Sequence, residues 1–180
     1  RSTDDFLRVK ELESIFVYDI LEDSYGKLWM ATYSDGVFCY DLPQNRWKHY
    51  TWIPGDSTSL PYNKVISIFE DSHKRIWFTT QGAGFCRFCP EADNFVCYDM
   101  TDGFPSNIVY KIVEDNEGNL WMATERDGLY FFNTHTKALK KLPFTDNVQT
   151  LYLDKPKNIL WIGTLLGGLK KYDLQTQSTQ

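Results

Sequence analysis

An all-β fold built from repeated short hairpins is predicted by three features of the sequence. Aromatic residues make up 16% of the chain, which favours strands because large flat side chains pack well on a pleated sheet. No segment shows the sustained apolar period of about 3.6 residues that an amphipathic helix requires. A tryptophan-centred motif recurs, and its tryptophans are Trp29, Trp77, Trp121 and Trp161.

The motif defines a unit of nearly constant internal layout. Residues 114–124 read EDNEGNLWMAT, residues 22–32 read EDSYGKLWMAT and residues 70–80 read EDSHKRIWFTT. Residues 153–164 read LDKPKNILWIGT, with one residue inserted. Seven positions after each tryptophan stands a glycine: Gly36, Gly84, Gly128 and Gly168. The variation in repeat length falls in the segment before the next copy, so one variable loop joins rigid units.

Each unit is expected to contain four short strands. An apolar first strand ends at the acidic pair, and an Asp-x-x-Gly turn leads to the second strand, which holds the tryptophan. Aspartate bonds its own backbone in such a turn, and glycine supplies the positive φ. Lys74 replaces that glycine in the second copy, which predicts strain or a different turn type there. The third strand starts at the repeated glycine, and a polar turn leads to the fourth.

Consecutive hairpins with a period of 40 to 48 residues predict a β-propeller in which each period is one four-stranded antiparallel blade. The expected blades span about residues 15–51, 63–100, 107–144 and 147–175, the last of them lacking its outer strand. Residues 6–12 are expected to form an outer strand. That strand would belong to a preceding blade if the chain is a fragment of a larger propeller of about seven blades. It would instead complete the last blade if four blades close into a ring.

The charge of the chain argues against two classes of partner. The sequence has 19 Lys and Arg against 24 Asp and Glu, a net charge of −5, and no basic cluster. Nucleic acid and anionic membrane surfaces are therefore not expected partners. No apolar run approaches the roughly 20 residues that a membrane helix needs. Three histidines and four cysteines are too scattered to predict a metal site or a cofactor.

The cysteines are expected to serve as small core residues. Cys86 and Cys89 have the C-x-x-C spacing, but both fall in one predicted strand, where a spacing of three points them to opposite faces. The redox form of that motif opens a helix instead. Cys97 lies across the same predicted hairpin, so Cys86 and Cys97 are the one pair expected to be placed for a disulfide. Cys39 lies a blade away.

No catalytic residue is predicted. The Trp, Thr, Gly and acidic columns recur from blade to blade, whereas a reacting centre needs a singular group. We therefore assign the tryptophans to the core between blades and the acidic pairs to turns. The hairpin is also similar to the Asp-box of sialidases, where it is structural. A glycosidase would need a close pair of carboxylates in a sugar cleft, and the sequence does not indicate one.

The loops between the second and third strands are the expected binding surface, because they differ between blades while the flanking Thr and Gly do not. The long loop 51–63 is expected on the same face. Trp52 in that loop suits stacking on a sugar, or it packs the loop down. Arg126 is expected to pair with an acidic glycan or with a neighbouring carboxylate. The candidate ligand residues are Tyr33, Asp35, Trp52, Tyr62, Gln81, Glu125 and Arg126.

The motif resembles the two-component regulator propeller repeats of hybrid two-component sensors, and residues 103–109 (GFPSNIV) resemble the loop that enters each blade of that family. The resemblance implies a periplasmic, non-catalytic sensor propeller of a membrane-anchored receptor. It also implies an oligosaccharide ligand and signalling to a histidine kinase. The implied partners are further blades and receptor domains of the same chain, and a second copy of the receptor. The alternatives are a propeller lyase or glycosidase, and a protein–protein interaction scaffold.

Overall fold

The computed structural model describes residues 12–100, 103–104, 106–144 and 146–179. These residues form four antiparallel sheets of four strands each. The first sheet contains β1 (Val17–Glu22), β2 (Lys27–Thr32), β3 (Val37–Asp41) and β4 (Arg46–Tyr50). The second contains β5 (Val65–Glu70), β6 (Ile76–Thr80), β7 (Phe85–Cys89) and β8 (Asn94–Tyr98). The third contains β9 (Val109–Glu114), β10 (Leu120–Thr124), β11 (Gly128–Phe132) and β12 (Leu139–Lys141). The fourth contains β13 (Val148–Asp154), β14 (Ile159–Thr164), β15 (Leu169–Asp173) and β16 (Ser178–Thr179).

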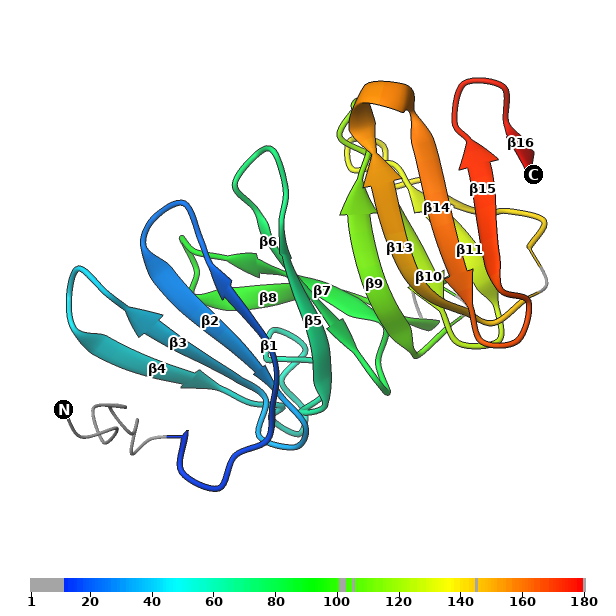
Figure 1. Ribbon diagram of the computed structural model, residues 1–180. Coiled ribbons are helices and arrows are strands. Elements are labelled where there is room, and N and C mark those ends of the chain that lie inside the picture. The colour runs from blue at the N-terminus through cyan, green and yellow to red at the C-terminus, as the bar shows by residue number, and fades with distance from the viewer. Residues whose placement is uncertain (1–11, 101–102, 105, 145, 180) are drawn as a thin grey trace, which may run out of the picture.

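The four sheets are the blades of a partial propeller, and they follow one another in an open row (Figure 1). The first strand of each blade lies innermost, because β1 contacts β5, β5 contacts β9, and β9 contacts β13. The 3-10 turn η3 (Lys155–Lys157) holds the residue inserted in the fourth repeat. In the described part of the chain, no helix has the length and apolar character required to cross a membrane.

An aspartate ties each of the first three turns to a buried tryptophan. In the second blade, Asp71 Oδ1 accepts hydrogen bonds from the backbone N–H groups of His73 (2.9 Å) and Arg75 (3.0 Å). Asp71 Oδ2 accepts one from Trp77 Nε1 at 2.8 Å. The corresponding Trp Nε1–Asp Oδ2 distances are 2.8 Å for Trp29 with Asp23 and 2.9 Å for Trp121 with Asp115. We call this arrangement the Asp–Trp clamp.

The turn of the second blade keeps the backbone of the others despite its lysine. The turn glycines Gly26 and Gly118 have φ of +76° and +79°, and Lys74 has φ of +65°. The same left-handed conformation recurs at Asn158 in the fourth blade. Lys74 therefore accepts backbone strain in an unchanged turn, and the alternative of a different turn type is not observed.

Three apolar cores fill the seams between neighbouring blades. Trp29 packs with Ile68 and Phe78 between the first and second blades. Trp77 lies in the core between the second and third blades, and Trp121 in the core between the third and fourth. Trp161 is only half-buried. It belongs to the last blade of the row, on which no following blade packs in the described residues.

The glutamates of the acidic pairs in the second and third blades join neighbouring blades, a role that the sequence did not indicate. Glu70 accepts a hydrogen bond from the backbone N–H of Ser24 at 3.1 Å, and Ser24 Oγ bonds to the same carboxylate. Glu114 accepts the equivalent bonds from Ser72, at 3.0 Å from N and 2.7 Å from Oγ. Lys155 of the fourth blade forms an ion pair with Glu114 at 3.3 Å.

The prediction that the fourth blade lacks its outer strand is wrong. Ser178 and Thr179 form β16 and pair with Asp173 and Tyr172. The chain reverses because Asp173 Oδ1 accepts the N–H groups of residues 175 and 176, and Gln177 adopts φ of +55°. The segment 6–12, expected to be an outer strand, lies outside the described residues apart from Leu12.

A salt bridge between the first two blades predicts a pH-dependent contribution to stability. Asp93 Oδ2 pairs with Lys48 Nζ at 2.6 Å, and Asp93 Oδ1 accepts the Tyr50 hydroxyl at 2.7 Å. Desolvation opposes ionisation of Asp93, but the hydrogen bonds from Lys48 and Tyr50 outweigh it and hold the pKa below its usual value. A carboxylate with a depressed pKa stabilises the fold above its unfolded pKa, about 3.9, and loses that contribution as pH falls through its folded pKa.

We expect Asp93→Asn to lower the urea midpoint of unfolding at pH 7. The difference in midpoint between the variant and the native chain should disappear as the pH falls below about 4. Urea titrations of both proteins between pH 7 and pH 2.5 measure the gap. A gap of constant size across that range would contradict the assignment.

Candidate functional site

The loops between the second and third strands of the blades lie beside the entry to the innermost strands. In Figure 1 the β2–β3 and β14–β15 connections lie at the lower edge of the sheets. The first residue of each loop donates its backbone N–H to the residue just ahead of the innermost strand, with distances of 2.9 to 3.2 Å. The donor and acceptor pairs are Tyr33 and Phe16, Gln81 and Lys64, Glu125 and Ile108, and Leu165 and Asn147.

A threonine and a glycine frame each of these loops. The threonine hydroxyl donates a hydrogen bond to the carbonyl of the glycine four residues later, at 2.8 to 2.9 Å in all four blades. The glycines adopt φ between +68° and +83°. The loops are therefore held in one backbone frame, and their side chains differ from blade to blade. The framing pairs are Thr32 and Gly36, Thr80 and Gly84, Thr124 and Gly128, and Thr164 and Gly168.

Three exposed aromatic rings gather at the loop end of the first blade. Phe16, Tyr18 and Tyr33 lie with ring centroids 5.5, 6.1 and 5.7 Å apart, and they are 66%, 44% and 47% exposed. Lys64 of the neighbouring blade places its Nζ 4.0 Å from the centroid of the Tyr33 ring, where a cation is attracted to the ring face. We call these four side chains the aromatic cluster. It offers open ring surface beside a positive charge.

Tyr62 and Gln81 continue the same face into the second blade. The Tyr62 ring packs on the backbone of Gly82, since a Cβ at Gly82 would lie 2.6 Å from a ring carbon. The backbone N–H of Gln81 binds the carbonyl of Lys64 at 2.9 Å. Lys64 therefore connects the ring of Tyr33 with the loop that holds Gln81.

A polar group occupies the same face in the third blade. The Tyr110 hydroxyl donates to Glu125 at 3.2 Å. Burial and then the negative charge of Glu125 raise the pKa of Tyr110, so the phenol stays protonated. Arg126 is exposed and adopts φ of +64°. Its neighbour Asp127 pairs with Lys141 at 3.7 Å, so that carboxylate is engaged elsewhere.

Three stretches of the chain, residues 11–34, 59–82 and 103–126, match the family described as two component regulator propeller. Each stretch runs from ahead of the innermost strand, through the aspartate turn and the tryptophan strand, into the framed loop. The matched stretches are similar to two-component regulator propeller repeats. The fourth repeat, with its inserted residue, lies beyond the matched stretches.

Solved structures share the fold of the regulator-propeller repeats. The extracellular domain of a protein described as a hybrid two-component system from B. thetaiotaomicron matches with a TM-score of 0.80 and 21% identity, over 100% of this chain and 25% of that one. The extracellular domain of a protein described as a one-component system from the same organism matches with a TM-score of 0.75 and 18% identity, over 92% and 23%. The chain thus spans about a quarter of the length of these proteins.

An enzyme also shares the fold. Virginiamycin B lyase from Staphylococcus aureus matches with a TM-score of 0.62 and 18% identity, over 89% of this chain and 56% of that one. Identity at this level shows the propeller architecture and not the chemistry. No curated protein matches the chain significantly.

Two candidate residues, Asp35 and Trp52, are held by local contacts. Asp35 accepts the Ser34 hydroxyl at 2.7 Å, and its backbone N–H binds the Thr32 hydroxyl at 2.9 Å. Trp52 is 50% exposed, and its backbone N–H binds Asn63 Oδ1 at 2.7 Å. Leu60 of the long loop is fully buried, whereas half of the Trp52 surface is exposed.

The sequence indicated Tyr33 but missed three members of the aromatic cluster. Phe16 and Tyr18 lie at the start of the segment that the sequence predicted as an apolar first strand. A register shift between Val17 and Asp19 interrupts the pairing of β1 with β2 beside them. The available signal was the comparison of repeats, because Lys64 and Ile66 occupy the corresponding positions of the second copy, where the first has aromatic residues.

One group of three potential metal ligands comes together among the described residues: Asp71, His73 and Glu114, whose ligand atoms lie within 4.8 Å of one another. Their carboxylates are already engaged. Asp71 forms an ion pair with Arg75 at 2.5 Å, and Glu114 pairs with Lys155. Because cations of the chain neutralise both carboxylates, we assign this group to the joining of blades.

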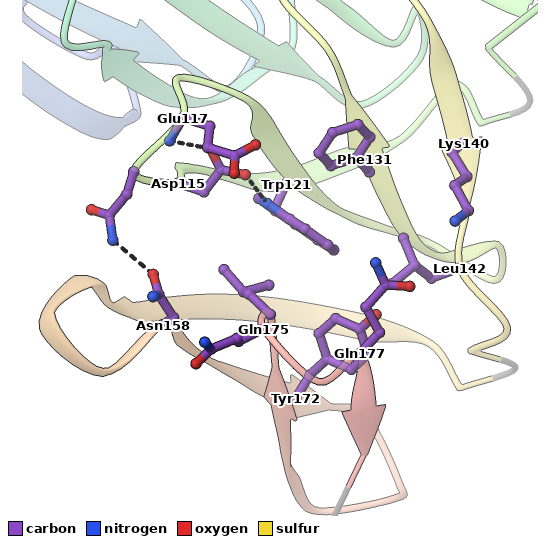
Figure 2. Close-up of a pocket in the computed structure, with 12 residues that line it drawn as sticks. Asp115, Glu117, Trp121, Phe131, Lys140, Leu142, Asn158, Tyr172, Gln175 and Gln177 are labelled. Atoms are coloured by element: carbon purple, nitrogen blue, oxygen red, sulfur yellow. Dashed lines mark hydrogen bonds between the residues drawn. The ribbon is translucent and has the colours of Figure 1, made fainter.

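Two clefts open between blades on the side of the aspartate turns. Figure 2 shows one of about 510 Å³ between the third and fourth blades, with Trp121 and Phe131 on one wall and Tyr172, Gln175 and Gln177 on the other. A second, of about 600 Å³, opens between the first and second blades. Trp121 and Tyr172 are each only 7% exposed, so they present much less open ring surface than the aromatic cluster.

Proposed function

We propose that the chain is a non-catalytic, ligand-sensing segment of the propeller of a membrane-anchored receptor, and that it lies on the periplasmic side of the membrane. The regulator-propeller repeats support this assignment, as do the structural relatives, which are extracellular domains. The observation that carries the binding role is the aromatic cluster. Open aromatic rings beside a cation, on loops held in a fixed frame, suit the recognition of a polar ligand with an apolar face.

The proposed ligand is an oligosaccharide. A sugar ring has an apolar face that stacks on an aromatic side chain and a rim of hydroxyl groups that need hydrogen-bond partners. Phe16, Tyr18 and Tyr33 supply the rings, and the hydroxyls of the two tyrosines supply polar groups at their edge. Lys64 provides a positive charge next to Tyr33, which favours sugars that carry a carboxylate or a sulfate.

Signalling would follow from a shift in packing between receptor copies. Binding favours whichever arrangement of the receptor has the higher affinity for the ligand. The remaining blades and receptor domains of the same chain would pass this change through the membrane to a histidine kinase. In this scheme the propeller supplies binding energy and no chemical step.

We expect Tyr33→Ala to weaken oligosaccharide binding about tenfold, because stacking on one aromatic ring is worth roughly 1.4 kcal/mol. The probes are neutral xylo- and arabino-oligosaccharides together with uronate-containing and sulfated oligosaccharides. Isothermal titration of the full chain measures the affinity. The matched control is Tyr152→Ala, a tyrosine that is 67% exposed and lies on β13 in the fourth blade.

The two parts of the proposal fail separately. Unchanged affinity in Tyr33→Ala, with any oligosaccharide that binds, would contradict the site. Absence of binding by every member of the panel would contradict the ligand class.

A further inference from the structure

Two cysteines face each other across the outer hairpin of the second blade. Cys86 in β7 and Cys97 in β8 are direct partners in the ladder between these antiparallel strands. Cys86 is fully buried and Cys97 is partly buried. The Cys97 thiol donates a hydrogen bond to the carbonyl of Ser59 at 3.7 Å. Because Cys86 and Cys97 are direct partners, their side chains lie next to each other on one face of the hairpin.

The pairing places them where side chains approach most closely. The backbone N–H of Phe95 points away from β7, because it donates to the carbonyl of Thr58 at 2.9 Å. The pair Phe88 and Phe95 is therefore of the non-hydrogen-bonded kind, and such pairs alternate along an antiparallel ladder. Two positions further along, Cys86 and Cys97 form the next pair of this kind. Their Cα atoms are expected to lie about 4.5 Å apart, within the range of about 4.4 to 6.8 Å that a disulfide spans.

The other two cysteines are placed differently. Cys89 is opposite Asn94 in the same ladder, and Cys39 is opposite Lys48 in the first blade. Burial raises the pKa of Cys39 to about 12, so its thiol stays protonated. In the structure all four cysteines, which lie in the described part of the chain, are without a disulfide.

We propose that Cys86 and Cys97 form a disulfide when the protein reacts with a disulfide oxidant, such as oxidised glutathione or the disulfide form of an oxidoreductase. Cys97, the more accessible of the two, attacks the oxidant as a thiolate. This forms a mixed disulfide and releases one oxidant thiol. The Cys86 thiolate then attacks the Cys97 sulfur, forms the bond between Cys86 and Cys97, and releases the second oxidant thiol. Two electrons and two protons pass from the pair to the oxidant.

Burial sets when this reaction is fast. Desolvation raises the pKa of Cys86 well above its usual value, and the neighbouring Cys97 thiol raises it further. Thiolate is the reacting species, so closure is slow in the folded blade and faster while the chain folds. An oxidising compartment would supply the oxidant, and this point alone rests on the proposed periplasmic location.

The test is a thiol count after refolding. The reduced full chain is refolded with oxidised and reduced glutathione, quenched in acid, unfolded and alkylated with N-ethylmaleimide. We expect an intact mass with two alkyl groups, against four for a chain refolded with reducing agent alone. This result does not depend on where the protein resides, so it is separable from a failure of the sensor proposal.

Peptide mapping identifies the pair. Trypsin cleaves after Arg87 and a glutamate-specific protease cleaves after Glu91, so Cys86, Cys89 and Cys97 fall on three different peptides. The cross-link should join the peptides of Cys86 and Cys97, persist in Cys89→Ser and disappear in Cys97→Ser. Four alkylated thiols in the refolded, oxidised chain would overturn the proposal, as would a cross-link that contains Cys89 or Cys39.

Discussion

Replacing Gly84 by alanine is expected to lower the free energy of unfolding by about 3 kcal/mol, from left-handed strain plus overpacking. Gly84 has φ of +68°, and a Cβ added there would lie 2.3 Å from the carbonyl oxygen of Tyr98. That oxygen belongs to backbone at the end of β8, so the clash cannot be relieved by a side-chain rotation. The outer strand must move, and the loop framed by Thr80 and Gly84 moves with it.

Gly168 provides a matched control. It occupies the same position in the fourth blade with φ of +72°, but a Cβ added there meets no atom within 4 Å. Gly168→Ala should therefore show only the left-handed strain, about 1 kcal/mol. Urea titrations monitored by tryptophan fluorescence measure both variants. Equal losses would mean that the close approach to Tyr98 does not contribute.

Removal of the Asp71 carboxylate should have an effect of similar or greater size. Asp71 is buried, and it accepts hydrogen bonds from the backbone of His73 and Arg75, from Arg75 Nε and from Trp77 Nε1. In Asp71→Ala the indole N–H and the partly buried guanidinium lose their acceptor inside the protein. We expect a loss of about 3 to 5 kcal/mol, typical of breaking a buried ion pair from one side.

Two further variants isolate the cause. Asp71→Asn keeps an oxygen that can accept the turn N–H groups, but its amide N–H₂ then faces the indole N–H or the guanidinium. It should lose less stability than Asp71→Ala. Asp56→Ala removes an exposed carboxylate that bonds Thr58 in the long loop, and the loss should be much smaller. If Asp56→Ala is as destabilising as Asp71→Ala, the Asp–Trp clamp is not the source of the effect.

The repeated frame of this fold was predictable because the same local chemistry recurs. The aspartate turn, the tryptophan strand and the glycine after it each have a local cause, and four copies reinforce the assignment. The errors lie where a long-range contact decides the structure. The bonding of Glu70 to Ser24 depends on how neighbouring blades meet.

The candidate site was predictable only in part for the same reason. Tyr33 stands in a loop, and loop position alone pointed to it. Phe16 and Tyr18 stand in and beside a strand, where alternation does not say which side of the blade is open. Lys64 reaches Tyr33 from the next blade, and the sequence of one repeat does not show how neighbouring blades meet. The two clefts depend on the spacing and angle between neighbouring blades, and the sequence of a single repeat does not determine either.

Residues 70–72 also have a mechanical consequence. Glu70 receives hydrogen bonds from Ser24 of the first blade, Asp71 grips the core tryptophan of its own blade, and Ser72 donates to Glu114 of the third. Three adjacent residues therefore connect three successive blades. A tilt of the first blade pulls directly on the segment that holds the third. A small rotation of one blade should then be distributed over several interfaces between blades, and the row should not bend at one hinge.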